Sequence, residues 1–326
     1  MKPLIKWPGG KTRLLREILP LVPPHDHYCE PFVGGGALFF AVEPAVSSLN
    51  DISSELISFY RMVQAQDGAF LSILDAAAGL FENLGGPSSR ITCGIYGIEA
   101  AFKNAAHEFE CPIFDYGAFS GYLSRNVHRS KRLSTAMKSS FYYMVRDEYN
   151  SARRRKAEGS YESALFFLVR ELCFGSMFRY NSKDDFNIPY GGFSYDSKDL
   201  ASKVGRIRKV GFSGFFRNSL MTSHDFRELL HSLDGSKSSF VFLDPPYDSR
   251  FSGYSGNSFG SDEHAALRDT LAGAKYRFLL AIARTSFIEG LYKPLDLNIK
   301  VVPSRYSYSV RGRNDQSVDY LLMRNY

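Results

Sequence analysis

Four consecutive residues, Asp244, Pro245, Pro246 and Tyr247, carry the most specific chemical signal in the sequence. An exocyclic amine on an aromatic ring is a poor nucleophile because its lone pair is delocalised into the ring. The Asp244 carboxylate and the Pro245 carbonyl can each accept one N–H hydrogen bond from such an amine, which favours a pyramidal nitrogen aimed at a sulfonium methyl group. The prolines stiffen the turn and add no competing N–H donor, and the Tyr247 ring offers a face for stacking a flipped base.

This tetrapeptide directly follows the apolar run 240–243, which predicts a buried strand. In open α/β sheets ligands bind beyond the carboxyl ends of the strands, so such a strand would place Asp244 at the ligand-binding edge of the sheet. The structural alternative is a plain β-turn followed by an aromatic residue.

A second motif is the glycine-rich segment EPFVGGG at residues 30–36. Glycines here permit a tight strand-to-helix turn and a close approach of a ligand to backbone N–H groups, although a lone triple glycine is also common in flexible turns. Asp51 follows the next predicted strand about 20 residues further on, where an acid can accept hydrogen bonds from ribose hydroxyls. The triple glycine does not match the dinucleotide fingerprint, which disfavours a nicotinamide enzyme.

A third motif is KWPGGK at residues 6–11, which contains Trp7, the single tryptophan of the chain. One interpretation is a lid over a cofactor, with Lys11 near the carboxylate of that cofactor. The other is a structural turn with a tryptophan in the core.

The elements that must position these motifs form an interrupted pattern. Residues 27–40 predict a short strand, a glycine turn and the start of a helix, 46–51 a second strand and 53–64 a helix. Helical stretches at 140–156 and 161–173 dominate the middle of the chain. Sheet signals return at 238–247, 275–283, 297–308 and 317–325. The sequence therefore predicts a discontinuous α/β domain, residues 1–60 and 205–326, interrupted by a mostly helical insertion at 61–204.

Charge and composition restrict the class of partner. The formal net charge is +6, and residues 125–156 contain ten Lys or Arg against two acids. Such a stripe suits a polyanion, although a solvated basic surface would have the same composition. The four cysteines show no CxxC spacing, which fits a reducing cytoplasm. With no apolar run of about 18 residues and no signal peptide, we expect no membrane span and no export.

Together the motifs resemble the Dam-type family of DNA adenine-N6 methyltransferases. The resemblance also includes FYYMVRDEYN (141–150), FRYNSKDDFNIPYG (178–191), YSGNSF (254–259) and RNDQSVDYLL (313–322). It implies a Rossmann-like, seven-stranded-type α/β sheet that binds S-adenosylmethionine, with 61–204 as an inserted target-recognition domain. A stretch at about 80–138 is longer than in typical relatives, and Gly175 replaces a longer polar side chain, so fine target specificity stays open.

The resemblance assigns site residues in three groups. Catalysis falls to Asp244, Pro245, Pro246 and Tyr247. Cofactor binding falls to Trp7, Lys11, Phe32, Val33, Gly34, Gly36, Asp51 and Asp244. DNA binding falls to Arg179, which would read a guanine edge, to the aromatic wedge Phe174, to Asn181 and Pro189, and to Arg153, Arg154 and Arg155 as phosphate contacts.

The function that follows is site-specific transfer of a methyl group to adenine N6 in duplex DNA by base flipping, without a metal or a covalent enzyme intermediate. We expect a monomer or a weak dimer in the cytoplasm of a bacterium, or a phage protein in a bacterial host, with or without a restriction partner. Two alternatives stay open. One is a methyltransferase that acts on RNA adenine or on another amine or amide, and the other is a catalytically silent DNA-binding homologue.

Overall fold

The computed structural model describes residues 1–84, 115–127, 132–233, 238–246, 259–303 and 319–326. The chain divides into two compact units. The first unit comprises Met1–Pro3, Gly9–Ile57 and Asn218–Tyr326, and the second comprises Leu4–Pro8 and Ser58–Arg217. The middle of the chain and the short segment Leu4–Pro8 therefore form one unit, and the other segments from both ends form the second. The assignment of catalysis to one unit and of target recognition to the other stays a prediction.

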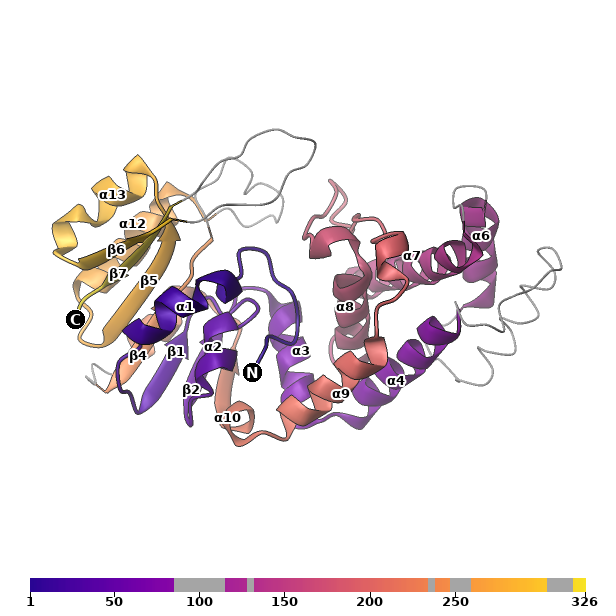
Figure 1. Cartoon of the computed structure of the whole chain (residues 1–326), viewed down its shortest axis with the longest axis horizontal. Coiled ribbons are helices and arrows are strands. Elements are labelled where there is room, and N and C mark those ends of the chain that lie inside the picture. The colour runs from indigo at the N-terminus through magenta and orange to yellow at the C-terminus, as the bar shows by residue number, and fades with distance from the viewer. Residues whose placement is uncertain (85–114, 128–131, 234–237, 247–258, 304–318) are drawn as a thin grey trace. The chain divides into compact units, whose positions relative to one another are not determined.

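The first unit is built on one seven-stranded sheet with the strand order β3-β2-β1-β4-β5-β7-β6 (Figure 1). The strands are β1 (His27–Glu30), β2 (Ser47–Asn50), β3 (Ser219–Thr222), β4 (Ser239–Leu243), β5 (Arg277–Ala283), β6 (Asn298–Val302) and β7 (Tyr320–Arg324). The strands from β3 to β5 pair in parallel, and β7 lies antiparallel between β5 and β6. This mixed sheet confirms the predicted open α/β fold, whereas β3 was not predicted.

Helices of the first unit pack on this sheet because its central strands are apolar on both faces. All five residues of β4 are buried, as expected for a parallel strand covered on two sides. The helical elements are η1 (Lys11–Leu14), α1 (Leu15–Ile18), η2 (Leu19–Leu21), α2 (Ala37–Val42), α11 (Phe226–Ser232), α12 (Ser261–Ala272), α13 (Ser286–Tyr292) and η7 (Lys293–Leu295). Side chains of α11, α12 and α13 share one core with β1, β4, β5 and β7.

The second unit is mostly helical, as predicted. Its elements are α4 (Gly68–Asn83), α6 (Tyr116–Val127), α7 (Leu133–Arg154), α8 (Ser160–Leu172), η4 (Phe174–Ser176), η5 (Phe193–Tyr195), α9 (Leu200–Gly211) and α10 (Gly214–Arg217), while α3 (Ser54–Ala65) begins in the first unit and ends in the second. Helix α8 packs against both α4 and α7, and every residue from Glu162 to Leu172 is buried. Much of the long stretch at 80–138 lies outside the described residues.

The end of α9 shows how tightly the second unit is packed. A Cβ atom added to Gly211 would lie 2.4 Å from the Val63 carbonyl oxygen and 1.8 Å from Gln66 Nε2. Gly205, in the same helix, has no atom within 4 Å of the corresponding position. Only glycine fits at position 211 without displacing the end of α3.

We therefore expect Gly211→Ala to lower the free energy of unfolding by about 1–3 kcal/mol, because the backbone of α3 must move. Gly205→Ala is the matched control and should be neutral or stabilising by up to about 1 kcal/mol, since alanine is the better helix former. Urea titrations followed by the fluorescence of Trp7, which lies in the second unit, measure both. Equal effects of the two substitutions would contradict the packing described.

Candidate active site

Three carboxylates lie at one edge of the sheet in the first unit. Glu30 is the last residue of β1, Asp51 follows β2 directly, and Asp244 follows β4 directly. Because β2, β1 and β4 are adjacent and parallel, their carboxyl ends bring these three acids to the same edge. Open α/β sheets bind their ligands at this edge.

Asp244 forms an ion pair with Lys11. The ammonium donates a hydrogen bond to Asp244 Oδ1 and a second one, of 3.1 Å, to the Gly9 carbonyl oxygen. The Asp244 side chain is 20% exposed, whereas Lys11 is buried. Burial raises the pKa of Asp244 and the Lys11 ammonium lowers it. The KWPGGK motif predicts that Lys11 lies near a cofactor carboxylate; in this structure its ammonium is paired with Asp244.

The other predicted catalytic residues follow in sequence. Pro245 is buried and Pro246 is exposed. Tyr247 lies outside the described residues.

Asp51 fixes the glycine-rich turn between β1 and α2. Its Oδ2 accepts a 2.9 Å hydrogen bond from the Gly34 N–H, and its Oδ1 accepts a 3.0 Å bond from the Ser53 N–H. Gly34 and Gly36 have φ angles of 47° and 65°, a left-handed region that favours glycine. Burial raises the pKa of Asp51 to about 6, against the effect of the two N–H groups. The turn is therefore held in one conformation by an acid on the neighbouring strand.

Two further residues of the predicted cofactor loop flank these glycines. The Val33 N–H donates a 2.8 Å hydrogen bond to the Asn50 carbonyl, and Val33 is buried. Phe32 is half-buried, and its ring centroid lies 5.3 Å from that of Phe226 and 5.5 Å from that of Phe259.

Glu30 is a buried acid for which the sequence motifs predict no role. Its Oε1 accepts hydrogen bonds from the Tyr28 hydroxyl and, at 2.9 Å, from the Phe39 N–H in the first turn of α2. Burial raises the pKa of Glu30 to about 8, although both hydrogen bonds oppose the rise. Glu30 thus joins the end of β1 to the start of α2, on the other side of the glycine turn. The sequence signal that could have identified Glu30 is its position at the end of a predicted strand, before a glycine turn.

The KWPGGK motif is divided between the units, because Leu4–Pro8 belongs to the second unit and Lys11 to the first. Trp7 is half-buried within the second unit. Its ring centroid lies 5.1 Å from that of Phe178 and 6.4 Å from that of Phe166. The two predicted cofactor contacts of this motif therefore pack in different units.

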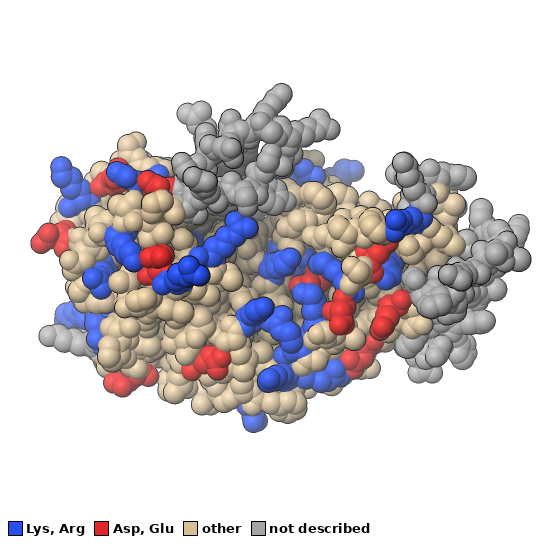
Figure 2. Space-filling model, in the orientation of Figure 1, with Lys and Arg blue, Asp and Glu red and all other residues tan. Residues whose placement is uncertain are grey.

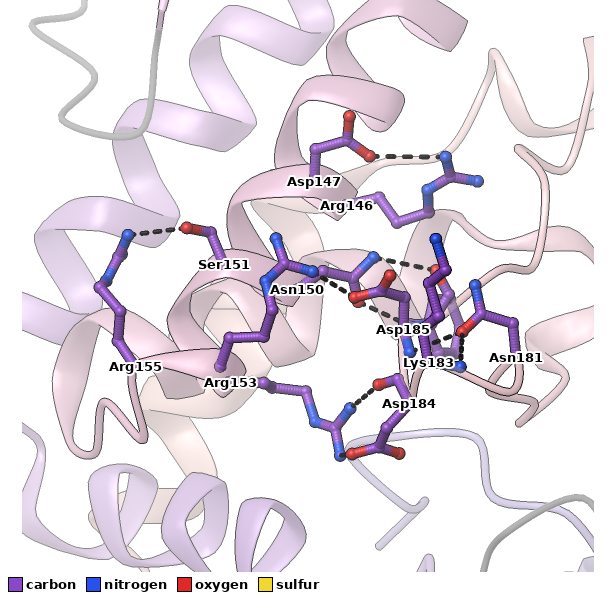
Figure 3. Close-up of polar contacts among 12 residues, drawn as sticks. Arg146, Asp147, Asn150, Ser151, Arg153, Arg155, Asn181, Lys183, Asp184 and Asp185 are labelled. Atoms are coloured by element: carbon purple, nitrogen blue, oxygen red, sulfur yellow. Dashed lines mark hydrogen bonds and ion pairs between the residues drawn. The ribbon is translucent and has the colours of Figure 1, made fainter.

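The predicted base-reading residues lie in a segment, residues 174–189, which we call the recognition segment. Within it Tyr180 and Phe186 form an antiparallel bridge, and Asn181 Oδ1 closes the intervening turn by accepting the N–H groups of Lys183 (2.8 Å) and Asp185 (3.0 Å). The carboxamide oxygen of Asn181 is therefore engaged in the turn itself (Figure 3).

The other three residues of the recognition segment that are predicted to contact DNA differ in exposure. Arg179 is half-buried, and its Nε donates a 2.9 Å hydrogen bond to Asn187 Oδ1. Phe174 is 48% exposed. Pro189 is exposed, and its carbonyl accepts a 2.8 Å hydrogen bond from the Phe174 N–H.

Helix α7 holds the turn of the recognition segment through polar contacts (Figure 3). The Asn150 side chain pairs with the Phe186 backbone, accepting its N–H at 2.7 Å and donating to its carbonyl at 3.1 Å. Arg153 donates to the Asp184 carbonyl at 2.5 Å and pairs with the Asp184 carboxylate at 3.1 Å. These contacts tie the turn of the recognition segment to α7.

Each of the three arginines predicted to contact phosphates forms an ion pair. Arg153 pairs with Asp184, Arg154 with Asp185, and Arg155 with Glu148 at 2.9 Å. Acidic side chains lie among the basic ones on the face shown in Figure 2. A phosphate that contacts these arginines must therefore compete with a carboxylate.

In the described part of the chain, no group of three or more His, Cys, Asp or Glu side chains is arranged to hold a metal ion. None of the described helices is long and apolar enough to cross a membrane.

The parallel sheet with β7 inserted antiparallel at one side, and the acids at its carboxyl edge, define an α/β methyltransferase fold. The chain belongs to the D12 class N6 adenine-specific DNA methyltransferase family, whose model matches residues 7–84 and 121–308. The predicted enzyme class, an adenine-N6 methyltransferase acting on DNA, is thereby confirmed.

The chain is also similar to individual methyltransferases over most of its length. The chain is 27% identical to the type II methyltransferase M.CviBI of Paramecium bursaria Chlorella virus NC1A, over 90% of this chain and 86% of that protein. It is 24% identical to the type II methyltransferase M1.LlaDCHI of Lactococcus lactis subsp. cremoris, over 100% and 96%. It is 26% identical to the DNA adenine methylase of Haemophilus influenzae, over 82% and 73%.

The buried acid Glu30 predicts a pH dependence of stability. In the unfolded chain its pKa is the ordinary 4.5, and in the folded chain it is about 8. The folded protein therefore holds a proton that the unfolded chain releases, so the free energy of unfolding falls as the pH rises from about 4.5 to about 8. Glu30→Gln keeps an acceptor oxygen for Tyr28 and Phe39 and should lose this part of the decline.

Urea unfolding at about pH 5 and about pH 8 measures the effect. The wild type should gain stability relative to Glu30→Gln at the lower pH, while Glu158→Gln, an exposed control, should follow the wild type. A parallel pH dependence of the wild type and Glu30→Gln would show that Glu30 does not bind the proton.

Proposed function

We propose that this enzyme transfers the methyl group of S-adenosylmethionine to N6 of an adenine flipped out of duplex DNA at a specific site. The observation that carries the proposal is the placement of Asp244 and Pro245 directly after β4, at the binding edge of the sheet. Asp244 lies there beside the buried ammonium of Lys11, which favours the ionised form of the acid.

The geometry of Asp244 suits activation of an exocyclic amine. Lys11 engages Oδ1, so we assign Oδ2 and the Pro245 carbonyl oxygen as the two acceptors for the N6–H groups. Two acceptors on one amine favour a pyramidal nitrogen with a localised lone pair. This lone pair would be aimed at the methyl group that S-adenosylmethionine supplies; the new N–C bond would replace the methyl–sulfur bond, S-adenosylhomocysteine would leave, and the N6 proton would pass to solvent. Tyr247 is the proposed stacking partner of the flipped base.

The glycine turn and the acids beside it fit the cofactor. When bound, S-adenosylmethionine supplies an electrophilic methyl group on a positively charged sulfur. The residues that we propose to bind it are Trp7, Lys11, Phe32, Val33, Gly34, Gly36, Asp51 and Asp244. A Cβ added to Gly36 would lie 3.2 Å from the Phe40 ring, so the turn stays narrow and free of side chains at this point. Asp51 uses each oxygen once for the turn, and each retains a lone pair for a ribose hydroxyl.

The recognition segment is the proposed reader of the DNA sequence. Asn187 engages Arg179 through Nε, which leaves the two terminal nitrogens of the guanidinium for O6 and N7 of a guanine. The exposed ring of Phe174 is the proposed wedge between bases. Asn181 and Pro189 shape the segment, and Arg153, Arg154 and Arg155 are proposed to meet phosphates by exchanging a carboxylate partner for a phosphate.

Modified-base sequencing tests the function directly. Plasmid DNA from cells expressing the wild type should contain N6-methyladenine in one sequence context. Asp244→Asn keeps the shape of the side chain but loses the charge, and we expect it to lower the rate of methyl transfer about a hundredfold or more. Its circular dichroism and thermal midpoint, compared with those of the wild type, serve as the folding control.

Three results would contradict this proposal. Modification of cytosine, or transfer only to RNA or to protein amides, would replace the substrate. DNA binding without any methylation by the wild type would indicate a silent homologue. A wild-type rate in folded Asp244→Asn would remove Asp244 from catalysis.

A further inference from the structure

Arg170 is a buried cation in the last turn of α8. It is 1% exposed, and among the described residues it is the largest of the fully buried side chains. No carboxylate in the described part of the chain forms an ion pair with it. A buried charge without an ion-pair partner is costly to the folded state unless other contacts offset the lost hydration.

Two backbone carbonyls hold the guanidinium. Nη1 donates a 2.6 Å hydrogen bond to the Met177 carbonyl oxygen, and Nη2 donates a 3.0 Å bond to the Lys6 carbonyl oxygen. The Nε atom of Arg170 has no hydrogen-bond partner among the described residues. The rigid fork of an arginine can reach both carbonyls at once, which a lysine ammonium does less well.

Two aromatic rings lie against the same guanidinium. Its central carbon is 5.3 Å from the ring centroid of Trp7 and 4.7 Å from that of Phe178. The two rings are themselves 5.1 Å apart. The faces of aromatic rings attract cations, so the rings partly offset the missing carboxylate.

The partners of Arg170 come from two segments with different assigned roles. Lys6 and Trp7 belong to the N-terminal motif proposed to bind the cofactor. Met177 and Phe178 directly precede Arg179, the proposed reader of a guanine. All of them lie in the second unit, so the contacts are internal to one compact body.

We propose that Arg170 is a positioning residue that fixes the cofactor-binding segment and the base-reading segment in one mutual arrangement. A ligand that orders Trp7 then also orders the backbone beside Arg179, and DNA bound at Arg179 orders Trp7 in return. This inference rests on the proposed function, because it takes Trp7 as a cofactor contact and Arg179 as a base contact. The coupling must be the same in both directions, since both are equilibrium binding steps.

The test measures the dissociation constant for DNA without and with saturating S-adenosylhomocysteine and takes the ratio of the two. The duplex contains the sequence in which the wild type methylates adenine. The wild type should show a ratio of about 5 or more, and Arg170→Lys a ratio below about 2. Arg170→Met is the second variant, which removes the charge altogether. Arg208→Lys is the matched control, because Arg208 pairs with Asp75 on the surface of the same unit, and it should keep the wild-type ratio.

Trp7 provides an independent readout, because it is the only tryptophan. In Arg170→Lys its emission should shift and its quenching by acrylamide should increase, while Arg208→Lys leaves both unchanged. A wild-type ratio and unchanged emission in folded Arg170→Lys would overturn the proposal, and so would a ratio of one in a wild type that binds both ligands. A wild type that binds neither ligand would instead overturn the proposed function, and this inference with it.

Discussion

The structure of the site depends on placing three acidic side chains, two of them buried, at one edge of a parallel sheet. Glu30, Asp51 and Asp244 end neighbouring strands, and desolvation raises the pKa of each. A different contact offsets the desolvation cost of each acid: an ammonium for Asp244, two backbone N–H groups for Asp51, and a hydroxyl and a backbone N–H for Glu30. The conformations of the glycine turn and of the segment around Lys11 follow from satisfying these acids.

This arrangement separates the acids by role. Asp51 and Glu30 accept hydrogen bonds that hold the turn between β1 and α2. The turn would therefore already have its conformation before the proposed cofactor binds. Asp244 is the acid with part of its surface exposed, and the charge on Lys11 favours its ionised form at the sheet edge. In the second unit, contacts from α7 and α8 perform the corresponding task for the recognition segment. In both units, polar contacts from neighbouring elements therefore position the segments that we propose to bind ligands.

Local sequence patterns predicted the glycine turn, the strand before Asp244 and most of the sheet, because each is encoded by neighbouring residues. They did not predict β3, a four-residue strand with two of its positions only partly covered or exposed. The pairing of Lys11 with Asp244 joins residues 233 positions apart, which no local pattern records. Arg170 was missed because an isolated arginine in an apolar helix normally reaches solvent, and here it does not.

We propose that the partly exposed Asp244 acts as a carboxylate because Lys11 lies beside it. The pH dependence of kcat/KM for methyl transfer, compared between the wild type and Lys11→Met, tests this most directly, since kcat/KM reports the free enzyme. Removal of the ammonium disfavours the charged form and raises the pKa of Asp244, so the acid limb of the variant should move to higher pH. An acid limb at the same pH in both proteins would contradict the account.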